Sequence, residues 1–244
     1  MKSFFVVLSI FACSTSFSQN ILISEDFEGA NLPPGWTISS NATDGGWNLG
    51  TNQILESQWW SIAPHGNFIG TNDDDCSCDK SMDYLIMPTM DFSNSTEIAL
   101  QFENYYDGGS FGGDTETATL EYSVNNGNSW SVISEINGTD DGAWDAQSFD
   151  LSSLAGNPSV LIGFHYNDNG GWMFGWAIDD VLLFEPQGLD AAITDLSVNS
   201  NQDAPTTIPI TGTVSNVGAE TINSFDITWS LGGGIAYTLS LIHI

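Results

Sequence analysis

The chain has 244 residues, and its 31 acidic side chains against 2 basic ones give a formal net charge of −29 at pH 7. Phosphate groups are bound by basic surfaces, so this charge excludes nucleic acid as a partner and excludes anionic membrane surfaces as well. The acidity is typical of a soluble protein of an extracellular or salty habitat, and divalent cations would offset the repulsion between its own charges.

The first segment, residues 1–19, predicts a signal peptide. Lys2 supplies the positive charge at its start and Phe4–Ala12 the apolar run. This run is too short to span a bilayer, which takes about 20 apolar residues, and no later stretch qualifies. Lipoprotein processing at Cys13 is the alternative. Removal of Lys2 with the leader leaves Lys80 as the only basic side chain of the mature protein.

Short strand-like segments, separated by turn residues, fill the stretch from residue 20 to residue 186. Ile98, Leu100 and Phe102 alternate with other residues, as in a half-buried strand. Asn125–Asn128 supplies the positive-φ residues that a tight hairpin requires. The strands expected, in chain order, are 21–28, 36–39, 57–63, 67–71, 83–88, 97–106, 115–124, 130–136, 145–151, 159–166 and 172–184. This pattern predicts an all-β fold, a β-sandwich, and roughly 165 residues are enough for one substantial core.

Two cysteines of the mature chain, Cys76 and Cys78, lie in the acidic loop 73–79. Two thiols cannot form a zinc site alone, and the only histidines in the interior of the sequence are His65 and His165. We therefore expect either a local disulfide or two free thiols in a loop. A metal role for the surrounding aspartates is a further alternative.

The last strand of this segment, Trp172–Phe184, has apolar residues on both faces, which predicts that it is covered on both sides. Asp179 and Asp180 lie in its middle, and alternation points them to opposite faces. A buried carboxylate without a partner costs several kcal/mol, and the chain has almost no basic side chains to offer. We therefore predict that one of these aspartates is a calcium ligand.

The alternation also predicts which aspartate is deeper. Asp180 shares its face with Ile178 and Leu182, whereas Asp179 lies on the face with smaller residues. If the bulkier face looks into the sandwich, Asp180→Asn lowers calcium-dependent stability more than Asp179→Asn does. A one-residue bulge would exchange the two faces.

A second β unit is expected after a boundary at Gln187 and Gly188. Residues 189–238 contain strand-like segments at 189–198, 208–218 and 225–230, which match the first three strands of an immunoglobulin-like module. The last residues, 239–244, resemble the translation of a sequencing adaptor. We therefore expect them to be an artefact and the natural chain to continue beyond them.

Five motifs between residues 21 and 184 occur in the order found in one group of extracellular domains. They are Glu25–Gly29 (EDFEG), Leu32–Trp36 (LPPGW), Asp83–Pro88 (DYLIMP), Tyr122–Trp130 (YSVNNGNSW) and Trp176–Val181 (WAIDDV). Together they resemble the jelly-roll adhesin domains of secreted Bacteroidetes proteins, which include the cleaved-adhesin and choice-of-anchor J families, the gingipain adhesin domains and, more distantly, MAM domains. Residues from 189 onward are similar to the CARDB-like modules that often follow such domains.

The resemblance implies a secreted or cell-surface protein with structural calcium rather than catalysis. Such chains usually end in a type IX secretion signal or another surface anchor, here expected beyond residue 244. A jelly roll brings its first and last strands together, and the polar loop before Trp47 matches a loop that holds metal in gingipain adhesins. Calcium is bound by several oxygen ligands. The calcium ligands predicted on this basis are Asp26, Glu28, Asn41, Asp44, Asp179 and Asp180.

Two features that suggest chemistry have simpler explanations. Gly108–Gly112 matches G-x-S-x-G, but a nucleophile elbow needs a strand–turn–helix context, and this match lies in a glycine-rich connection between strands. We expect no enzymatic activity, and we expect Ser110→Ala to change nothing. His165 lies beside apolar strand positions, which favours a structural role; haem binding, by analogy with gingipain adhesins, is the alternative.

Two aromatic pairs are candidates for a ligand surface. Trp59 with Trp60, and Tyr105 with Tyr106, lie on expected strands, where neighbours point to opposite faces. They are either buried on both sides or form an exposed aromatic platform for a sugar or a protein. The leading hypothesis is a non-catalytic adhesion module whose partner is an extracellular protein or glycan. The alternatives are a carbohydrate-binding module and an accessory domain of a secreted peptidase.

Overall fold

The computed structural model describes residues 8–9, 19–139, 141–186, 191–198, 210–216, 222, 224–231 and 236–243. The chain divides into two compact units: one is Ile21–Glu185, and the other combines Met1–Asn20 with Pro186–Ile244. No helix among the described residues has the length and apolar character that a membrane-spanning helix needs.

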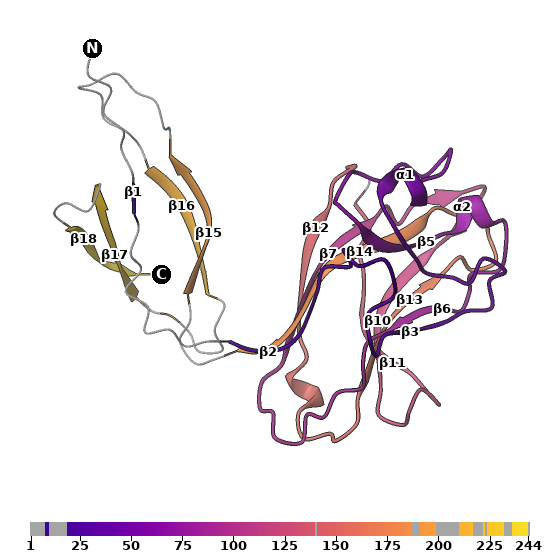
Figure 1. Ribbon diagram of the computed structural model, residues 1–244, viewed down its shortest axis with the longest axis horizontal. Helices are drawn as coiled ribbons and strands as arrows, with labels where there is room; N and C mark the ends of the chain where they lie inside the picture. Colours follow the sequence, from indigo (N-terminus) through magenta and orange to yellow (C-terminus); the bar gives the residue numbers. More distant parts are fainter. Residues whose placement is uncertain are drawn as a thin grey trace, which may run out of the picture. The chain divides into compact units, whose positions relative to one another are not determined.

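The unit Ile21–Glu185 is a sandwich of two sheets, visible as two layers of strands in Figure 1. One sheet has the order β11-β10-β13-β6-β3, and the other has the order β12-β7-β14-β5-β4, with β2 also paired to β14. The first sheet contains β3 (Thr37–Ser39), β6 (Asp83–Ile86), β10 (Thr117–Ser123), β11 (Ser131–Glu135) and β13 (Leu161–Asn167). The second contains β2 (Asn20–Glu25), β4 (Asn48–Gly50), β5 (Phe68–Asn72), β7 (Ala99–Tyr106), β12 (Asp145–Asp150) and β14 (Gly175–Glu185). The predicted all-β sandwich is confirmed.

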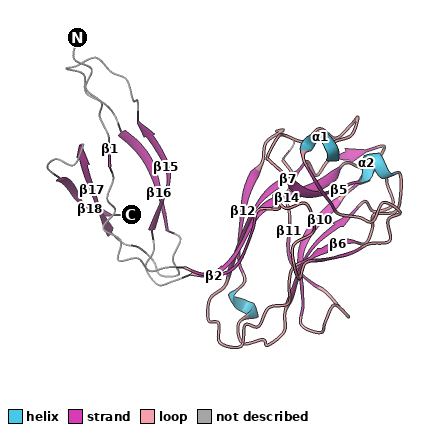
Figure 2. Cartoon of the chain, in the orientation of Figure 1, coloured by secondary structure: helices cyan, strands magenta, loops and turns pink. Residues whose placement is uncertain are grey.

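Several short elements that the sequence did not predict complete this unit. They are the helices α1 (Asn52–Leu55) and α2 (Asp73–Cys76), the 3-10 turn η1 (Ser152–Leu154), and a small hairpin of β8 (Ser110–Phe111) and β9 (Asp114–Thr115). Each helix is a single turn, too short to show a helical period. Both α helices lie at one end of the sandwich and η1 at the opposite end, as Figure 2 shows.

The main core lies between the two sheets and follows the predicted alternation. Leu100 and Phe102 of β7 are buried, and the Phe102 ring meets Phe164 of β13 edge-on at 5.1 Å between centroids. Each large apolar side chain buried in this way stabilises the fold by about 1.5–3 kcal/mol. At the β10–β11 turn, Asn126 and Gly127 have positive φ, as expected of the Asn-rich hairpin.

A second apolar cluster covers the outer face of the six-stranded sheet. It contains Leu55, Trp60, Ile62, Phe68, Tyr105 and Ala177. Trp60 and Ile62 come from the segment 57–63, which was expected to be a strand but is not one. This segment packs on the sheet rather than pairing with it, and Tyr105 Oη donates a hydrogen bond to Ser61 O at 2.6 Å. β14 is therefore covered on both faces, as predicted.

In the other unit, β15 (Ala191–Val198) pairs with β16 (Ile210–Asn216), and β1 (Leu8–Ser9), β17 (Ser224–Leu231) and β18 (Ala236–His243) form a separate sheet. Strands are thus present in the three segments where they were expected. Leu8 and Ser9 of the expected leader and most of the expected adaptor tail belong to the second of these sheets. The rest of the leader except Gln19, including Cys13, and the boundary at Gln187 and Gly188 lie outside the described residues.

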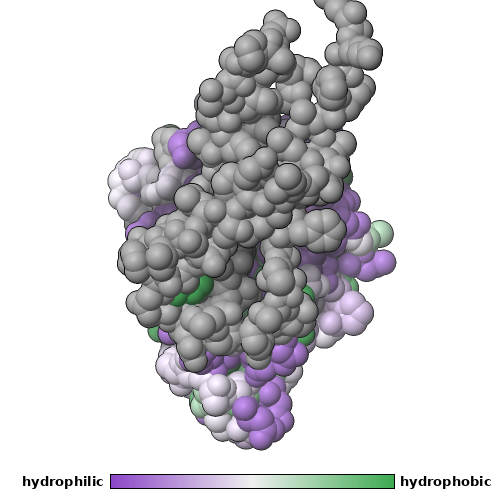
Figure 3. All heavy atoms as spheres, turned by 90° about the vertical axis from the view of Figure 1, so that its left-hand side faces the viewer, coloured by the Kyte–Doolittle hydropathy of each residue, from purple (hydrophilic) through white to green (hydrophobic). Residues whose placement is uncertain are grey.

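The visible surface of the described residues agrees with the acidic composition. In the view of Figure 3, these residues are mainly coloured as hydrophilic or neutral, with few hydrophobic patches between them.

Candidate functional site

A bulge in β14 decides where the two aspartates of the closing strand point. The pairing with β7 shifts in register between Asp179 and Leu182, and Asp180 has a φ of 49°. Asp179 is buried, with 3% exposure, whereas Asp180 is exposed. The extra residue lets both Ile178 and Val181 face the main core. The prediction that Asp180 is the deeper carboxylate is wrong, because strict alternation does not survive a bulge.

Asp179 lies beside His65 and forms the centre of a candidate metal site. Asp179 Oδ2 is 2.8 Å from His65 Nδ1, and Asp179 Oδ1 accepts the Asp180 backbone N–H at 2.8 Å. Burial raises the pKa of Asp179 to about 6, although these hydrogen bonds oppose the shift. One ligand atom from each of His65, Asp179 and Asp180 lies within 4.8 Å of the others.

The first strand brings Glu28 to the same neighbourhood, because β2 pairs with β14. The Glu28 carboxylate accepts the Asn67 backbone N–H at 3.2 Å and the Asn67 side-chain amide at 3.1 Å. Glu28 and Asp179 therefore both bind the loop of residues 65–67, at Asn67 and at His65. Asp26 is exposed and accepts the Glu28 backbone N–H at 3.3 Å, so that it orders the turn after β2.

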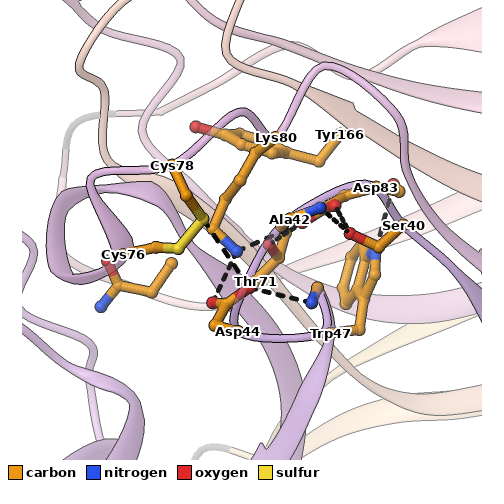
Figure 4. Close-up of polar contacts among 12 residues, drawn as sticks. Ser40, Ala42, Asp44, Trp47, Thr71, Cys76, Cys78, Lys80, Asp83 and Tyr166 are labelled. Atoms are coloured by element: carbon orange, nitrogen blue, oxygen red, sulfur yellow. Dashed lines mark hydrogen bonds and ion pairs between the residues drawn. A yellow bond between two sulfur atoms is a disulfide. The ribbon is translucent and has the colours of Figure 1, made fainter.

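Lys80, the only basic side chain expected in the mature protein, is fully buried between two carboxylates. Figure 4 shows its ammonium group donating to Asp44 Oδ2 at 2.8 Å and to Asp83 Oδ2 at 3.3 Å. Asp83 is also fully buried, and it accepts further hydrogen bonds from the hydroxyls of Ser40 and Thr71. Lys80 thus neutralises carboxylates that would otherwise be costly in the interior.

This arrangement gives a protein cation to the polar loop before Trp47, and the calcium expected at Asn41 and Asp44 stays a prediction. Asp44 Oδ2 accepts a hydrogen bond from the Lys80 ammonium group, and Asn41 is exposed in the same loop. Cys76 and Cys78 lie next to Asp44, but they are joined in a disulfide and offer no thiolate to a metal. Of the two outcomes expected for these cysteines, the structure has the local disulfide.

The four aromatic residues considered for a platform do not share a surface. Trp60, Tyr105 and Tyr106 are buried, and only Trp59 is exposed, at 68%. Trp60 and Tyr105 pack in the outer-face cluster, while Tyr106 packs against Trp176 in the main core, with 6.2 Å between ring centroids. Because both faces of this sheet are covered, neighbouring aromatics on β7 are buried on both sides. The platform prediction is wrong for these three residues.

Trp59 instead lines a cleft with other exposed aromatic side chains, which we call the aromatic cleft. Its volume is about 420 Å³, and it is lined by Trp59, Asp74, Phe111, Trp172, Met173 and Phe174. The exposed fractions of Trp59, Phe111 and Trp172 are 68%, 61% and 55%. No other Trp or Phe is exposed among the side chains that the structure describes.

Asp74 of α2 holds two walls of the aromatic cleft in place. Its Oδ2 atom accepts the Trp59 backbone N–H at 3.3 Å, and its carbonyl oxygen accepts the Trp172 indole N–H at 3.3 Å. On the third side, a Cβ atom on Gly109 would lie 2.8 Å from the Phe174 ring. Glycine at this position therefore lets the β8–β9 hairpin, which carries Phe111, approach closely.

A second cavity adjoins the aromatic cleft at Trp172, which lines both. It has a volume of about 550 Å³ and contains the carboxylates of Asp73, Asp79, Asp114 and Asp168 in its lining; we call it the acidic cavity. Asp73 and Asp168 are buried, with 1% and 2% exposure. Burial raises the pKa of Asp73 to about 6, even though its carboxylate accepts the Met173 backbone N–H at 2.6 Å.

Ser110 and His165 have the structural settings that the sequence favoured. Ser110 lies at the exposed start of the β8–β9 hairpin, where no helix follows, so the strand–turn–helix context of a nucleophile elbow is missing here. His165 Nδ1 lies 2.9 Å from Glu121 Oε1 and its Nε2 lies 3.1 Å from Ser81 O. Its ring stacks on Tyr84 at 4.0 Å. Both ring nitrogens of His165 thus have hydrogen-bond partners within the protein.

The sequence analysis missed Phe111 and placed Trp172 at the start of a strand. A signal for both was present: each is an isolated aromatic residue beside glycines, Ser110-Phe111-Gly112 and Gly170-Gly171-Trp172. A lone aromatic in a glycine-rich connection has no alternating partners with which to enter a core. Such residues are candidates for an exposed binding surface.

Comparison with known proteins finds one partial family match and several solved structures of low sequence identity. A family model described as Reelin subrepeat B matches residues 77–183, which is less than half of the chain. No curated protein sequence matches this chain.

Among solved structures, the K1 cleaved adhesin domain of Lys-gingipain from Porphyromonas gingivalis is 19% identical, with a TM-score of 0.41, and the match covers 66% of this chain and 96% of that chain. The CBM22-1 xylan-binding domain of Xyn10C from Paenibacillus barcinonensis is 13% identical, with a TM-score of 0.42, covering 69% and 96%. TmCBM61, solved in complex with β-1,4-galactotriose, is 15% identical, with a TM-score of 0.44, covering 69% and 99%.

Proposed function

We propose that the unit Ile21–Glu185 is a non-catalytic glycan-binding module of a secreted or cell-surface bacterial protein, with the aromatic cleft as its binding site. One observation carries the proposal: Trp59, Phe111 and Trp172 are exposed, and all three line one cavity. Leaving apolar area in water costs about 25 cal/mol per Å², so three such rings at one place indicate a surface that a ligand covers.

The chemistry of the aromatic cleft suits a sugar. Its volume of about 420 Å³ falls in the range of roughly 300–1,000 Å³ that small-ligand sites occupy. The flat faces of indole and phenyl rings stack against the apolar faces of pyranose rings, while Asp74 offers a carboxylate to their hydroxyl groups. The predicted signal peptide and the order of the five adhesin-like motifs support the secreted or cell-surface setting.

A glycan array with the purified unit tests this function. We expect defined oligosaccharides to bind, and we expect Trp172→Ala and Trp59→Ala each to weaken that binding by at least about tenfold, as for loss of an aromatic anchor worth more than about 1.4 kcal/mol. Val132→Ala is the matched control, because Val132 is an exposed apolar residue of β11 outside the cleft. Binding that survives both tryptophan replacements would contradict the assignment of the site.

We further propose that calcium binds at the β14 bulge and stabilises the unit. Asp179 and Asp180 supply carboxylates whose oxygen atoms lie close together, and the Glu28 carboxylate hydrogen-bonds Asn67, two residues after His65. Calcium prefers oxygen ligands, so the carboxylates and not the His65 imidazole would hold it. These acids fit a calcium ion in their chemistry, and the raised pKa of Asp179 shows how unfavourable its charge is without a cation.

Thermal melting with calcium and with chelator tests the metal. We expect a higher melting temperature with calcium, loss of this response in Asp179→Asn, and a smaller response in Asp180→Asn. His65→Gln should keep the calcium response, since nitrogen is a poor calcium ligand. Asp91→Asn is the control, because Asp91 is exposed and belongs to neither cavity nor bulge. An unchanged melting temperature across millimolar calcium would contradict this proposal.

A further inference from the structure

The aromatic cleft and the acidic cavity together select the charge of what they bind. The two cavities adjoin at Trp172, which lines both. Two consecutive residues of α2 also connect them, because Asp74 lines the aromatic cleft and Asp73 lines the acidic cavity. Trp172 is also fixed to α2, since its indole N–H donates to Asp74 O at 3.3 Å. A ligand that stacks on Trp172 therefore extends from an apolar cleft directly into a group of carboxylates.

The charged side chains that line this double site are all acidic. Its lining contains five carboxylates, those of Asp73, Asp74, Asp79, Asp114 and Asp168. No lysine or arginine lines either cavity, and the only basic side chain of the unit, Lys80, is buried in its pairs with Asp44 and Asp83. Anionic sugars are therefore repelled here, and a cationic group is attracted both by the carboxylates and by the aromatic faces.

We propose that the ligand of this site is a glycan with free, protonated amino groups, that is, a polymer of amino sugars that are not acetylated. Stacking on Trp59, Phe111 and Trp172 holds the sugar rings, and Asp74 and the acidic cavity hold the ammonium groups of neighbouring rings. This inference rests on the proposed glycan-binding function and adds the charge of the glycan to it. A basic peptide would satisfy the carboxylates as well, but it lacks the succession of sugar rings whose apolar faces three exposed aromatic side chains accommodate.

Calorimetric titration of the unit with two hexasaccharides tests the proposal: fully deacetylated chitosan hexamer and its N-acetylated counterpart, chitin hexamer, near pH 6. We expect the amine form to bind at least about tenfold more tightly, and its affinity to fall as salt rises. Asp114→Asn should weaken the amine form by roughly threefold or more and leave any binding of the acetylated form unchanged, whereas Asp74→Asn should weaken the amine form more than the acetylated form. Asp91→Asn, which removes a charge outside both cavities, should have no effect.

The outcomes separate this inference from the proposed function. If the acetylated hexamer binds as tightly as the amine form, the charge preference is wrong and the glycan site stands. If Trp172→Ala leaves chitosan binding unchanged, or if an oligolysine peptide binds as tightly as chitosan, the attraction comes from the net charge of the protein and the inference fails. If neither hexamer binds and the glycan array is blank, the proposed function itself fails.

Discussion

Lys80 shows, at the scale of single residues, how a chain with 31 acidic side chains keeps some of them inside. Its ammonium group is shared between Asp44, which is partly exposed, and Asp83, which is fully buried. The sequence identified Lys80 as the only basic residue of the mature chain, but residue spacing could not show which carboxylates it neutralises, because Asp44 is brought to it by folding. The calcium role predicted for Asp44 rests on the resemblance of its loop to a metal-binding loop of gingipain adhesins, and it stays a prediction.

Replacing Lys80 tests how much this pairing contributes. Lys80→Met leaves Asp83 buried without its cation, so we expect the free energy of unfolding to fall by about 3–5 kcal/mol in urea titrations. The double variant Lys80→Met/Asp83→Asn should recover part of this loss, because it removes the isolated charge. Wild-type stability of the single variant would mean that Lys80 is not a buried partner of Asp83.

Glu116 and Glu121 are both buried glutamates, and the same substitution should affect them in opposite directions. Burial raises the pKa of Glu116 to about 7, although Tyr166 and the Phe174 backbone N–H donate hydrogen bonds to it; its Oε1 atom has no partner among the described residues. Burial also acts to raise the pKa of Glu121, but hydrogen bonds from neighbouring side chains outweigh it and hold the pKa below its usual value.

The sign of the pH dependence follows from these directions. Between about pH 4.5 and 7 the folded state keeps a proton on Glu116 that the unfolded state has lost, so the stability from this group falls as pH rises through that window. Glu116→Gln should therefore raise the melting temperature near pH 8 and change it little near pH 5. Glu121→Gln should lower the melting temperature near pH 8, where its charged form is stabilised. Thermal melts of both variants, with chelator present, check the two directions; parallel shifts would contradict them.

At the scale of elements, the strands could be predicted and their irregularities could not. Alternation in β7 and the Asn-rich turn after β10 indicated the sandwich correctly, since both are local properties of the sequence. The bulge in β14 depends on how this strand pairs with β7, so alternation alone assigned the wrong face to Asp180. The segment 57–63 has a strand-like composition, but it does not form a strand. Its apolar side chains, Trp60 and Ile62, pack in the outer-face cluster instead.

The bulge predicts a specific sensitivity at Asp180, whose φ of 49° lies in the left-handed region. Asn tolerates this conformation, whereas a β-branched side chain is strained in it. We expect Asp180→Val to lower the free energy of unfolding by about 1–3 kcal/mol and Asp180→Asn to remain near wild type, both measured with chelator so that metal plays no part. Equal stability of the two variants would contradict a left-handed residue at this position.

At the scale of the whole molecule, the unit Ile21–Glu185 combines a β-sandwich with aromatic side chains gathered from distant parts of the chain. Trp59 follows α1, Phe111 lies on β8, and Trp172 precedes β14, so only the folded unit brings them together. The sequence could therefore suggest a binding module as a hypothesis, but it could not show that these three aromatic residues lie together. The acidic side chains next to these rings add the preference for cationic groups that we infer.

The central claim, that ligand binds in the aromatic cleft, is tested most directly by the indole N–H signals of the tryptophans in a two-dimensional NMR titration. The signals are assigned by single Trp→Phe variants, and the glycan that binds most tightly on the array is added to saturation. We expect the indole signals of Trp59 and Trp172 to shift with the same dissociation constant, while the signal of Trp47, which is buried in the main core, stays in place. Saturable binding that leaves the signals of Trp59 and Trp172 unchanged would contradict it.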